Sequence, residues 1–438
     1  MNKKCIYLFI LFVGFGYQNP IKAQQLLTLQ EALRTALENN YAIQVAKNDA
    51  AISKNNNTAG GAGMLPVVNG NVSQDNQAID TRQKFLNGNE NNRDGARSNT
   101  LNAGVELNWT IFDGLRMFAS KSKLDKLEKI GELRMKANIE NVFLRVTKSY
   151  YEVVLNKQQL ETAKQSLINS EQRLQLAEDK WKAGKIAKTE MLKAKVDFNS
   201  DQAAYLRQEN LYKNSKVVLN QLLGRDLNTT FEVNDSLAKY KSFVLDDLMN
   251  KATENKALQA TKKTQQVSFL TVKEAEAERM PTLQLRSGYN LNRQQSEAGF
   301  LQSAQNMGFH YGGVLSMNLF NGFEVNRKIN MARIQLKSNE YIYKDSLSKI
   351  QQQINQAYNN YVLSTALTKL EMENVKVAEE NYDIASEQYK VGVITGIELR
   401  DAQLNLNLVK LRLLQAQYEA KLNETELMRL TGELLQLQ

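Results

Sequence analysis

Two long runs of the chain contain almost no residue that would interrupt a helix. Between Arg116 and Ala183 the only glycine is Gly131, and between Phe323 and Val391 there is neither glycine nor proline. Each run is nearly 70 residues long, and an unbroken helix of that length spans roughly 100 Å. Such a helix cannot fold back into a compact domain, so we expect it to pack along other long helices.

The segments that follow these runs are expected to supply the neighbours. Thr189 to Leu223 and Thr395 to Leu430 each follow a long run after a short turn and would return alongside it as a helical hairpin. Apolar residues recur every three or four positions along the second run, as in a coiled-coil seam. The residues of this seam are Leu347, Ile350, Ile354, Ala357 and Tyr361.

The chain also repeats itself at a fixed spacing. Three glycine pairs lie 208 residues apart, namely Gly114 and Gly322, Gly184 and Gly392, and Gly224 and Gly432. Upstream, Pro66 and Pro281 lie 215 residues apart, so the first half carries about seven extra residues, most naturally in the polar stretch Asp80 to Asn99. The spacing predicts two structural repeats, residues 24–232 and 233–438, each with a helix, a β-hairpin and a long helical hairpin.

Strand-like alternation lies between the helical segments. Leu101–Ile111, Thr282–Asn292 and Phe309–Leu319 alternate apolar and polar residues, and Val67–Ala78 does so more weakly. We expect strands of about 10 to 12 residues, the length of a tilted membrane strand. In a membrane barrel their polar face would line a watery lumen. Five aromatic residues on or beside these strands suit a membrane-interface belt, although ordinary β-propensity also explains them. They are Trp109, Phe112, Tyr289, Tyr311 and Phe320.

The first residues have the pattern of a secretory signal. Lys3 and Lys4 precede the apolar stretch Ile6–Phe15, and cleavage is expected after Ala23. Cys5, the only cysteine, lies inside this segment, so the mature chain has no disulfide or thiol chemistry. No later window holds the roughly 18 uninterrupted apolar residues of a membrane helix. The exported chain is therefore expected to be soluble or to enter a membrane through β-strands.

Composition argues against several classes of function. The formal charge is +9, but the charges of both signs are interspersed, so a nucleic-acid partner is not expected. His310 is the single histidine, and the sequence has no metal-ligand cluster, nucleophile–base set, phosphate loop or dinucleotide motif. We expect neither an enzyme nor a cofactor, and a structural role for His310.

Four strands in one chain are too few to close a barrel, and open strand edges cannot face lipid. Two chains would give eight strands with a filled interior, whereas three would give twelve strands and leave a channel. A conduit therefore favours a homotrimer. The alternative is a trimeric periplasmic or surface coiled-coil adhesin or stalk, which explains the helices but not the hairpins that lie between them twice.

The sequence resembles the TolC outer-membrane efflux family over nearly all of the mature chain. The resemblance begins at Leu27–Leu33, continues through Leu65-Pro66 and ends near Gly432. Its most specific marks are two turns, Trp181–Gly184 and Tyr389–Gly392, each followed by a helix that contains an acidic residue and Ala194 or Ala402.

This resemblance implies a mostly α fold with β, in which long helices of three chains form an α-barrel and four membrane β-strands per chain close a 12-stranded β-barrel. The barrel would lie in the outer membrane of a Gram-negative cell, and the helices would cross the periplasm. Gln24–Val45, Asn228–Leu258 and the C-terminal residues would build an equatorial region. The loops near Asp80–Asn99 and Arg293–Met307 would face outside, and the two glycine turns would form the periplasmic tip.

By the same resemblance, the protein is a passive exit duct of a tripartite efflux or type I secretion system. Its partners would be a periplasmic membrane-fusion adaptor, an inner-membrane pump that supplies the energy, and outer-membrane lipid. The cargo stays open among drugs, metal ions, siderophores and polypeptides.

The resemblance also assigns a gate at the periplasmic tip, formed by Glu398, Asp401, Tyr389 and Glu190. Glu398 and Asp401 share a helix face, and in a trimer they would form two acidic rings that favour cations. Thr395–Glu398 also fits a capping box, so helix capping is the simpler role of Glu398. For Tyr389 the simpler role is packing at a helix end. The family arginine of the gate latch is Ile394 in this chain, so Arg400 or Lys193 would have to replace it.

The resemblance also places the docking site of the adaptor on the two turns themselves, at Gly184, Gly392, Val391 and Val393. Both glycines have a simpler explanation, because a glycine at a helix C-terminus adopts a left-handed conformation cheaply.

Overall fold

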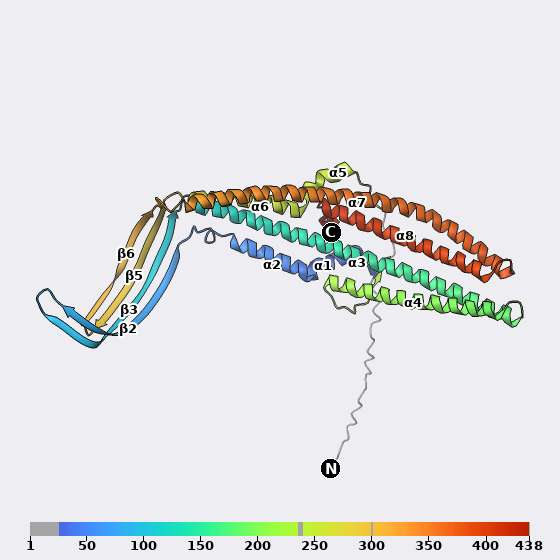
Figure 1. Cartoon of the computed structure of the whole chain (residues 1–438), viewed down its shortest axis with the longest axis horizontal. Coiled ribbons are helices and arrows are strands. Elements are labelled where there is room, and N and C mark those ends of the chain that lie inside the picture. The colour runs from blue at the N-terminus through green and yellow to red at the C-terminus, as the bar shows by residue number, and fades with distance from the viewer. Residues whose placement is uncertain (1–25, 235–239, 299–300, 438) are drawn as a thin grey trace, which may run out of the picture.

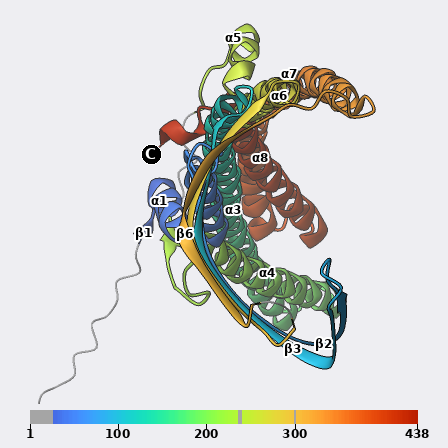
Figure 2. The same ribbon diagram turned by 90° about the vertical axis from the view of Figure 1, so that its left-hand side faces the viewer.

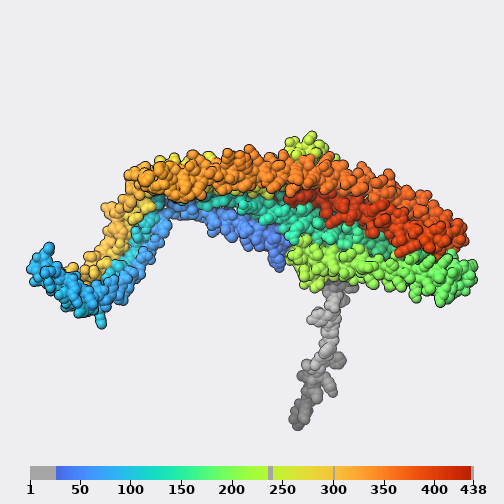
Figure 3. All heavy atoms as spheres, in the orientation of Figure 1, coloured from blue at the N-terminus to red at the C-terminus, as the bar shows by residue number. Residues whose placement is uncertain are grey.

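The computed structural model describes residues 26–234, 240–298 and 301–437. Within them the chain forms a long, bent molecule with a four-stranded sheet at one end and two helical hairpins that reach the other (Figure 1). The space-filling view shows the same arched outline (Figure 3). The expected signal segment, residues 1–23 with Cys5, lies outside the described residues.

The sheet is antiparallel throughout and has the strand order β2-β3-β5-β6. Its strands are β2 (Val67–Lys84), β3 (Glu90–Phe112), β5 (Thr282–Ser296) and β6 (Ser303–Ser316). Seen from its own end, the sheet is strongly curved (Figure 2). The two hairpins of the two halves therefore join into one sheet through the pair β3 and β5.

The strands are longer than the sequence pattern predicts. They contain 18, 23, 15 and 14 residues, and the expected loop Asp80–Asn99 is mostly strand, with a turn only at residues 85–89. Likewise β5 and β6 extend into the expected loop Arg293–Met307, while β6 ends at Ser316, before Leu319. Backbone pairing between strands needs no apolar side chain. At the end of the first hairpin oppositely charged side chains face each other, with Lys84 Nζ 3.1 Å from Glu90 Oε1.

Cross-strand register gathers the apolar residues on one face of the sheet. Val105 pairs with Tyr289, and Tyr289 pairs with Phe309. One position along, Glu106 pairs with Gly288, and Gly288 with His310, on the opposite face. The alternation in the sequence therefore predicts the two faces correctly, although it underestimates the length of the strands.

The long helices begin and end close to the predicted residues. α3 (Arg116–Lys182) and α4 (Lys188–Leu223) form the first hairpin, and α7 (Glu324–Val391) and α8 (Gly396–Leu430) form the second. Two shorter helices, α2 (Tyr41–Asn56) and α6 (Lys256–Ala277), lie along the sheet-proximal parts of the long ones (Figure 1). Among the helices that the structure describes, none combines the length and the apolar composition needed to span a bilayer.

Gly131, the only glycine within α3, lies where α2 crosses it. A Cβ atom at Gly131 would lie 2.8 Å from the Cβ of Ser53 and 3.5 Å from the Cα of Ala50. Glycine in a helix interior destabilises the helix relative to alanine. The close approach of α2, which leaves no room for a Cβ atom, explains why glycine is found at this position.

Both halves make the same local contacts at matching positions. Asn40 caps α2 and donates its side-chain amide to the carbonyl of Leu222, and Asn255 caps α6 and donates to the carbonyl of Leu430. At the turns from sheet to long helix, Leu115 and Phe323, again 208 residues apart, both have positive φ. These contacts support the duplicated plan. The predicted boundary between residues 232 and 233 falls inside the two-residue strand β4 (Glu232–Val233) and stays a prediction.

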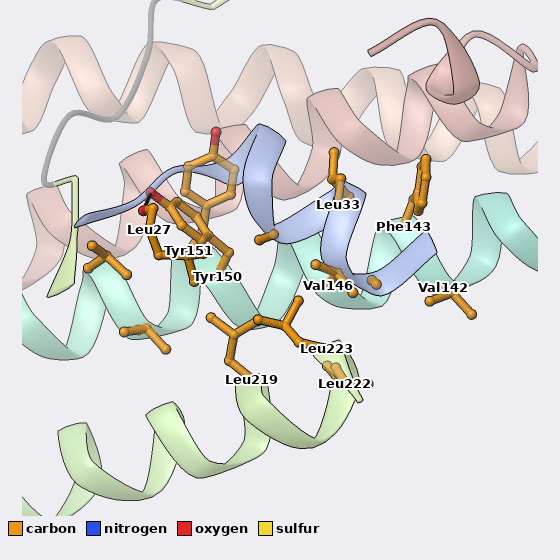
Figure 4. Packing of buried hydrophobic residues seen from close by; sticks show 14 of the residues in the cluster. Leu27, Leu33, Val142, Phe143, Val146, Tyr150, Tyr151, Leu219, Leu222 and Leu223 are labelled. Atoms are coloured by element: carbon orange, nitrogen blue, oxygen red, sulfur yellow. Dashed lines mark hydrogen bonds between the residues drawn. The ribbon is translucent and has the colours of Figure 1, made fainter. Parts of the chain in front are cut away.

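The main core lies at mid-length, where the remaining short elements surround the long helices. β1 (Leu26–Leu27) pairs with β4, and α1 (Leu29–Asn39) packs on α3 and α4. Figure 4 shows this cluster of buried side chains. The labelled residues are Leu27, Leu33, Val142, Phe143, Val146, Tyr150, Tyr151, Leu219, Leu222 and Leu223.

A second cluster buries the predicted seam of α7. Ile350, Ile354, Ala357 and Tyr361 pack with Leu347 beside them. Opposite them lie α5 (Leu245–Asn250), the 3-10 helix η1 (Lys251–Glu254), the start of α6 and the end of α8. A last 3-10 turn, η2 (Leu434–Leu437), joins the first cluster. The described parts of the segments expected to form an equatorial region thus lie near the middle of the long helices.

One carboxyl group is buried beside this core. Glu140 of α3 is 2% exposed, and its Oε1 has no hydrogen-bond partner among the described residues. Burial raises the pKa of Glu140 to about 7, against the opposing attraction of Lys256 and Arg429. Because the raised pKa belongs to the folded state, the stability linked to this group is complete below about pH 4.5 and is lost as pH rises through about 7.

Replacing Glu140 with glutamine tests this linkage. Above about pH 7 the variant should be more stable than the natural chain by about 3 kcal/mol, because no charge has to be buried. Below about pH 4.5 the two should unfold alike. Thermal and denaturant unfolding in detergent, followed by far-UV circular dichroism, measures the difference. The control is Glu373→Gln on the exposed surface of α7, and an equal pH dependence in all three proteins would contradict the assignment.

Candidate gate and docking surface

The two helical turns lie together at the end of the molecule farthest from the sheet (Figure 1). Gly184 and Gly392 have φ values of 72° and 87°, and both face open space. In each turn the glycine N–H donates to the carbonyl three residues earlier, and the next N–H donates to the carbonyl five residues before it. This pairing closes the helix C-terminus in the manner of a Schellman motif, so turn geometry alone explains both glycines.

The exposed surfaces of the two turns differ in chemistry. Val391 and Val393 are 77% and 71% exposed and flank Gly392 with apolar side chains. Lys182 and Lys185, both exposed, flank Gly184. A partner that contacts both turns therefore meets one apolar and one basic surface.

Glu398 forms the predicted capping box of α8. Its Oε2 accepts hydrogen bonds from the Thr395 backbone N–H at 2.7 Å and from the Thr395 hydroxyl at 2.9 Å. These bonds, the backbone bond first, lower the pKa of Glu398. The first turn has Ala187 at the cap, with no side-chain bond, as the sequence predicts. The capping role is confirmed, and the side chain stays exposed.

Asp401 lies one turn further along α8 and is exposed, like Glu398. Glu190, the counterpart of Glu398 in the first repeat, is exposed in the first turn of α4. The structure therefore brings all three predicted gate acids to the same end of the molecule.

Tyr389 is buried at the end of α7, where it packs with Ala385, Leu399 and Ala402. Lys180 of α3 donates to its carbonyl at 2.8 Å and lies 4.4 Å from the ring centroid. Burial raises the pKa of the Tyr389 phenol. Tyr389 thus packs at the helix end, which is the simpler of its two predicted roles. Its contact with Lys180 also links the two hairpins at the tip. A role as a gate latch stays a prediction.

Arg400 and Lys193 are the two cations that would have to replace the family arginine, whose position Ile394 occupies in this chain. Arg400 forms an ion pair that links the two helical hairpins. It donates from both terminal nitrogens to the carboxylate of Asp201 on α4, at 2.7 and 2.9 Å. Lys193 lines a pocket of about 300 Å³ between α4 and α8, together with Glu190, Tyr389 and Arg400 itself. Sequence reasoning missed Asp201, because no local pattern relates it to a residue 199 positions away.

The sheet at the opposite end exposes a wide apolar face. Val105, Tyr289, Phe309, Tyr311 and Leu315 are between 51% and 80% exposed on it. Such a contiguous uncovered surface requires a partner or a lipid environment.

The five aromatic residues considered for an interface belt do not lie at one level of the sheet. Trp109, Phe112 and Phe320 lie near the helical end, whereas Tyr289 lies at the middle of β5. His310 lies on the polar face, where its ring covers Gly288. The described residues contain no group of three or more side chains suited to hold a metal ion.

Three kinds of comparison agree on this architecture. The outer membrane efflux protein family matches residues 32–225 and 249–433. The outer membrane protein TolC of Vibrio cholerae is 21% identical over 341 residues, which cover 77% of this chain and 78% of TolC. The crystal structure of VceC from Vibrio cholerae aligns with a TM-score of 0.75 at 16% identity, over 92% of this chain and 96% of VceC.

The open-state channel MtrE of Neisseria gonorrhoeae aligns with a TM-score of 0.71 at 16% identity, over 93% and 89% of the two chains. At such low identity the structural likeness establishes the fold, and the family match covers most of the sequence. The chain therefore belongs to the outer membrane efflux protein family.

Proposed function

We propose that this outer-membrane efflux protein closes as a homotrimer into a continuous passive duct. The observation that carries the proposal is the sheet whose two edge strands, β2 and β6, have no further strand partner within the described chain, next to long helices that expose apolar side chains. We assign it no catalytic step and no cofactor.

The strand order supports closure by copies of the same chain. β2 and β6 run in opposite directions, so β6 of one copy can pair with β2 of the next in antiparallel fashion. Unpaired backbone groups at a membrane edge cost several kcal/mol each. Three copies give twelve strands and an open lumen, whereas two give a filled eight-stranded barrel. The polar face with Glu106 and His310 would then line the lumen, and the apolar face would contact outer-membrane lipid.

The long helices also expose apolar residues that neighbouring copies would cover. On α4 they are Leu192, Val196, Leu206, Leu211, Val217 and Val218, and on α7 they are Val362, Leu363, Leu370, Val377 and Ile384. Surfaces of this extent mark interfaces between chains. Side-by-side packing of such faces around a three-fold axis would continue the β-barrel as a helical tube into the periplasm.

The tip of this tube would be the gate. Three copies of Glu398 and Asp401 would form two acidic rings around the axis, with Tyr389 and Glu190 beside them. The exposure of both acids at the start of α8 supports this placement. Rings of carboxylates attract cations and repel anions.

Neutralising Glu398 and Asp401 tests the rings. Glu398→Gln keeps a capping-box residue, and combined with Asp401→Asn it should weaken block by divalent cations at least about tenfold, equivalent to about 1.4 kcal/mol. Single-channel recording in planar bilayers measures conductance and block. The control is Glu387→Gln, an exposed acid of the same tip paired with Lys390. A double variant that conducts and is blocked like the natural protein would exclude the acidic rings.

Family members work in tripartite systems, and we propose that the two turns receive a periplasmic adaptor joined to an inner-membrane pump. Gly184 and Gly392 leave open space at the tip, and Val391 and Val393 offer apolar contacts there. Adaptor docking on these four residues would connect the duct to the pump that supplies the energy.

A bulky residue at Gly392 tests the docking site. Gly392→Trp should reduce export, because one central contact residue accounts for about 2 kcal/mol or more, roughly 30-fold in affinity. Val391→Asp with Val393→Asp should do the same without backbone strain. Gly392→Asn, which tolerates positive φ, is the control for turn geometry. The measurements are export from cells and oligomer assembly. Wild-type export by both disruptive variants would rule out docking at this turn.

A further inference from the structure

On the exposed apolar face of the sheet, apolar residues give way to polar and charged ones toward the hairpin ends that lie away from the helices (Figure 1). Side chains two residues apart on a strand share a face, and directly paired residues lie side by side on it. The last fully apolar level consists of Val72, Ala103, Leu291 and Met307, which pair in that order across the sheet. The next level on the same face consists of Gln74, Leu101, Arg293 and Gln305. We call the apolar part of this face, from Leu283 to Leu291 along β5, the apolar band.

The apolar band has nearly the height of the hydrocarbon region of a membrane. Leu291 follows Leu283 by eight positions in β5, which is about 27 Å along the strand. At the tilt of about 40° that membrane strands adopt, this length gives roughly 20 Å along the membrane normal, close to the apolar height of about 25 Å in such barrels. The level of Arg293 would therefore lie at the outer boundary of the hydrocarbon.

Two arginines lie on this face beyond the apolar band. Arg293 is the next residue of β5 on the face, and Arg97 of β3 lies two levels further out, beside Ala78. Both side chains are exposed. Neither guanidinium forms an ion pair or a hydrogen bond with a residue that the structure describes. We call this pair the rim arginines.

The neighbouring charges leave the rim arginines uncompensated. Glu297 lies beside them, but its Oε2 accepts a hydrogen bond from the backbone N–H of Arg97 at 3.1 Å and not from the guanidinium. The carbonyl of Glu297 accepts from the side chain of Arg93 at 2.6 Å. Further out on the first hairpin, cations pair with acids, as Lys84 does with Glu90. With Arg93, the rim arginines thus place three cations against one carboxylate.

Phosphate is the anion whose chemistry suits these side chains. A guanidinium group donates two parallel N–H groups to phosphate oxygens and keeps its positive charge at every physiological pH. The rim arginines also continue the apolar band directly. A lipid whose acyl chains lie along the apolar band brings its headgroup to their level, so charge attraction adds to apolar contact. This continuity favours a lipid over a free ion.

We propose that the rim arginines bind the phosphate of an anionic lipid in the outer leaflet, whose acyl chains lie along the apolar band. This inference rests on the proposed function, because that function places the sheet in the membrane as part of a barrel wall. Three copies would repeat the site three times around the barrel. The bound lipids would then fix the height of the barrel in the membrane.

Titration with a fluorescent phosphatidic acid tests the site. The mature protein in neutral detergent should bind this lipid more tightly than fluorescent phosphatidylcholine, whose headgroup has no net charge. Arg97→Gln and Arg293→Gln should each weaken the binding of phosphatidic acid about fivefold, because one cation near an anionic lipid contributes about 1 kcal/mol. The double variant should bind the two lipids alike. Sedimentation checks the assembly of each variant.

Arg286→Gln is the matched control. Arg286 also lies on β5 and is exposed, but it pairs with Asn108 on the polar face of the sheet. Its removal should leave the binding of phosphatidic acid unchanged. An equal loss in this variant would reveal general charge attraction and overturn the site.

Inorganic phosphate at matched ionic strength separates a lipid from a free ion. It should not displace phosphatidic acid, because it has no acyl chains to contact the apolar band. Displacement by inorganic phosphate would reveal a site for the ion and overturn the assignment to a lipid.

The remaining outcomes separate the rim arginines from the duct itself. Glutamine variants that assemble and bind phosphatidic acid like the natural chain would overturn the site. If they fail to assemble, the salt dependence of the natural chain decides, since salt screens an exposed charge contact. Binding that weakens with salt supports the site, and binding that does not change overturns it. A natural chain that stays monomeric and never conducts would overturn the proposed function instead.

Discussion

The backbone groups on the two open edges of the sheet are the constraint on which the rest of the structure depends. A strand edge has a row of N–H and C=O groups that must find partners, and hydrocarbon offers none. β2 and β6 leave these rows unpaired within one chain, and their opposite directions allow them to pair with each other between chains. Closure of the proposed barrel wall by further copies of the chain would give every one of these backbone groups a partner.

The helices follow from the same geometry. Each hairpin of the sheet leads through a turn at positive φ, Gly114-Leu115 or Gly322-Phe323, directly into a helix of 67 or 68 residues. In the proposed trimer, a ring of strands would therefore continue as a ring of helices. Each half of the chain repeats this connection from a β-hairpin to a long helix, so every chain has two of them. The buried clusters at mid-length hold the two long helices in place relative to each other.

Sequence reasoning succeeded where the determinants are local. The near absence of glycine and proline predicted the long helices to within a few residues, and the Thr395–Glu398 spacing predicted a capping box that the structure contains. Strand length was underestimated, because polar hairpin ends pair through the backbone without an apolar signature. The ion pair between Arg400 and Asp201 could not be predicted, because the two residues lie on different helices, 199 positions apart, and neither belongs to a local motif. Only the fold shows that their side chains meet.

The central claim is that the wall closes through copies of the same chain. The most direct test is the mass of the mature protein in detergent, measured by sedimentation with the contribution of bound detergent determined separately, together with bilayer recording of the same sample. The account predicts three chains per particle and stepwise ion conduction. A stable monomer that never conducts would contradict it.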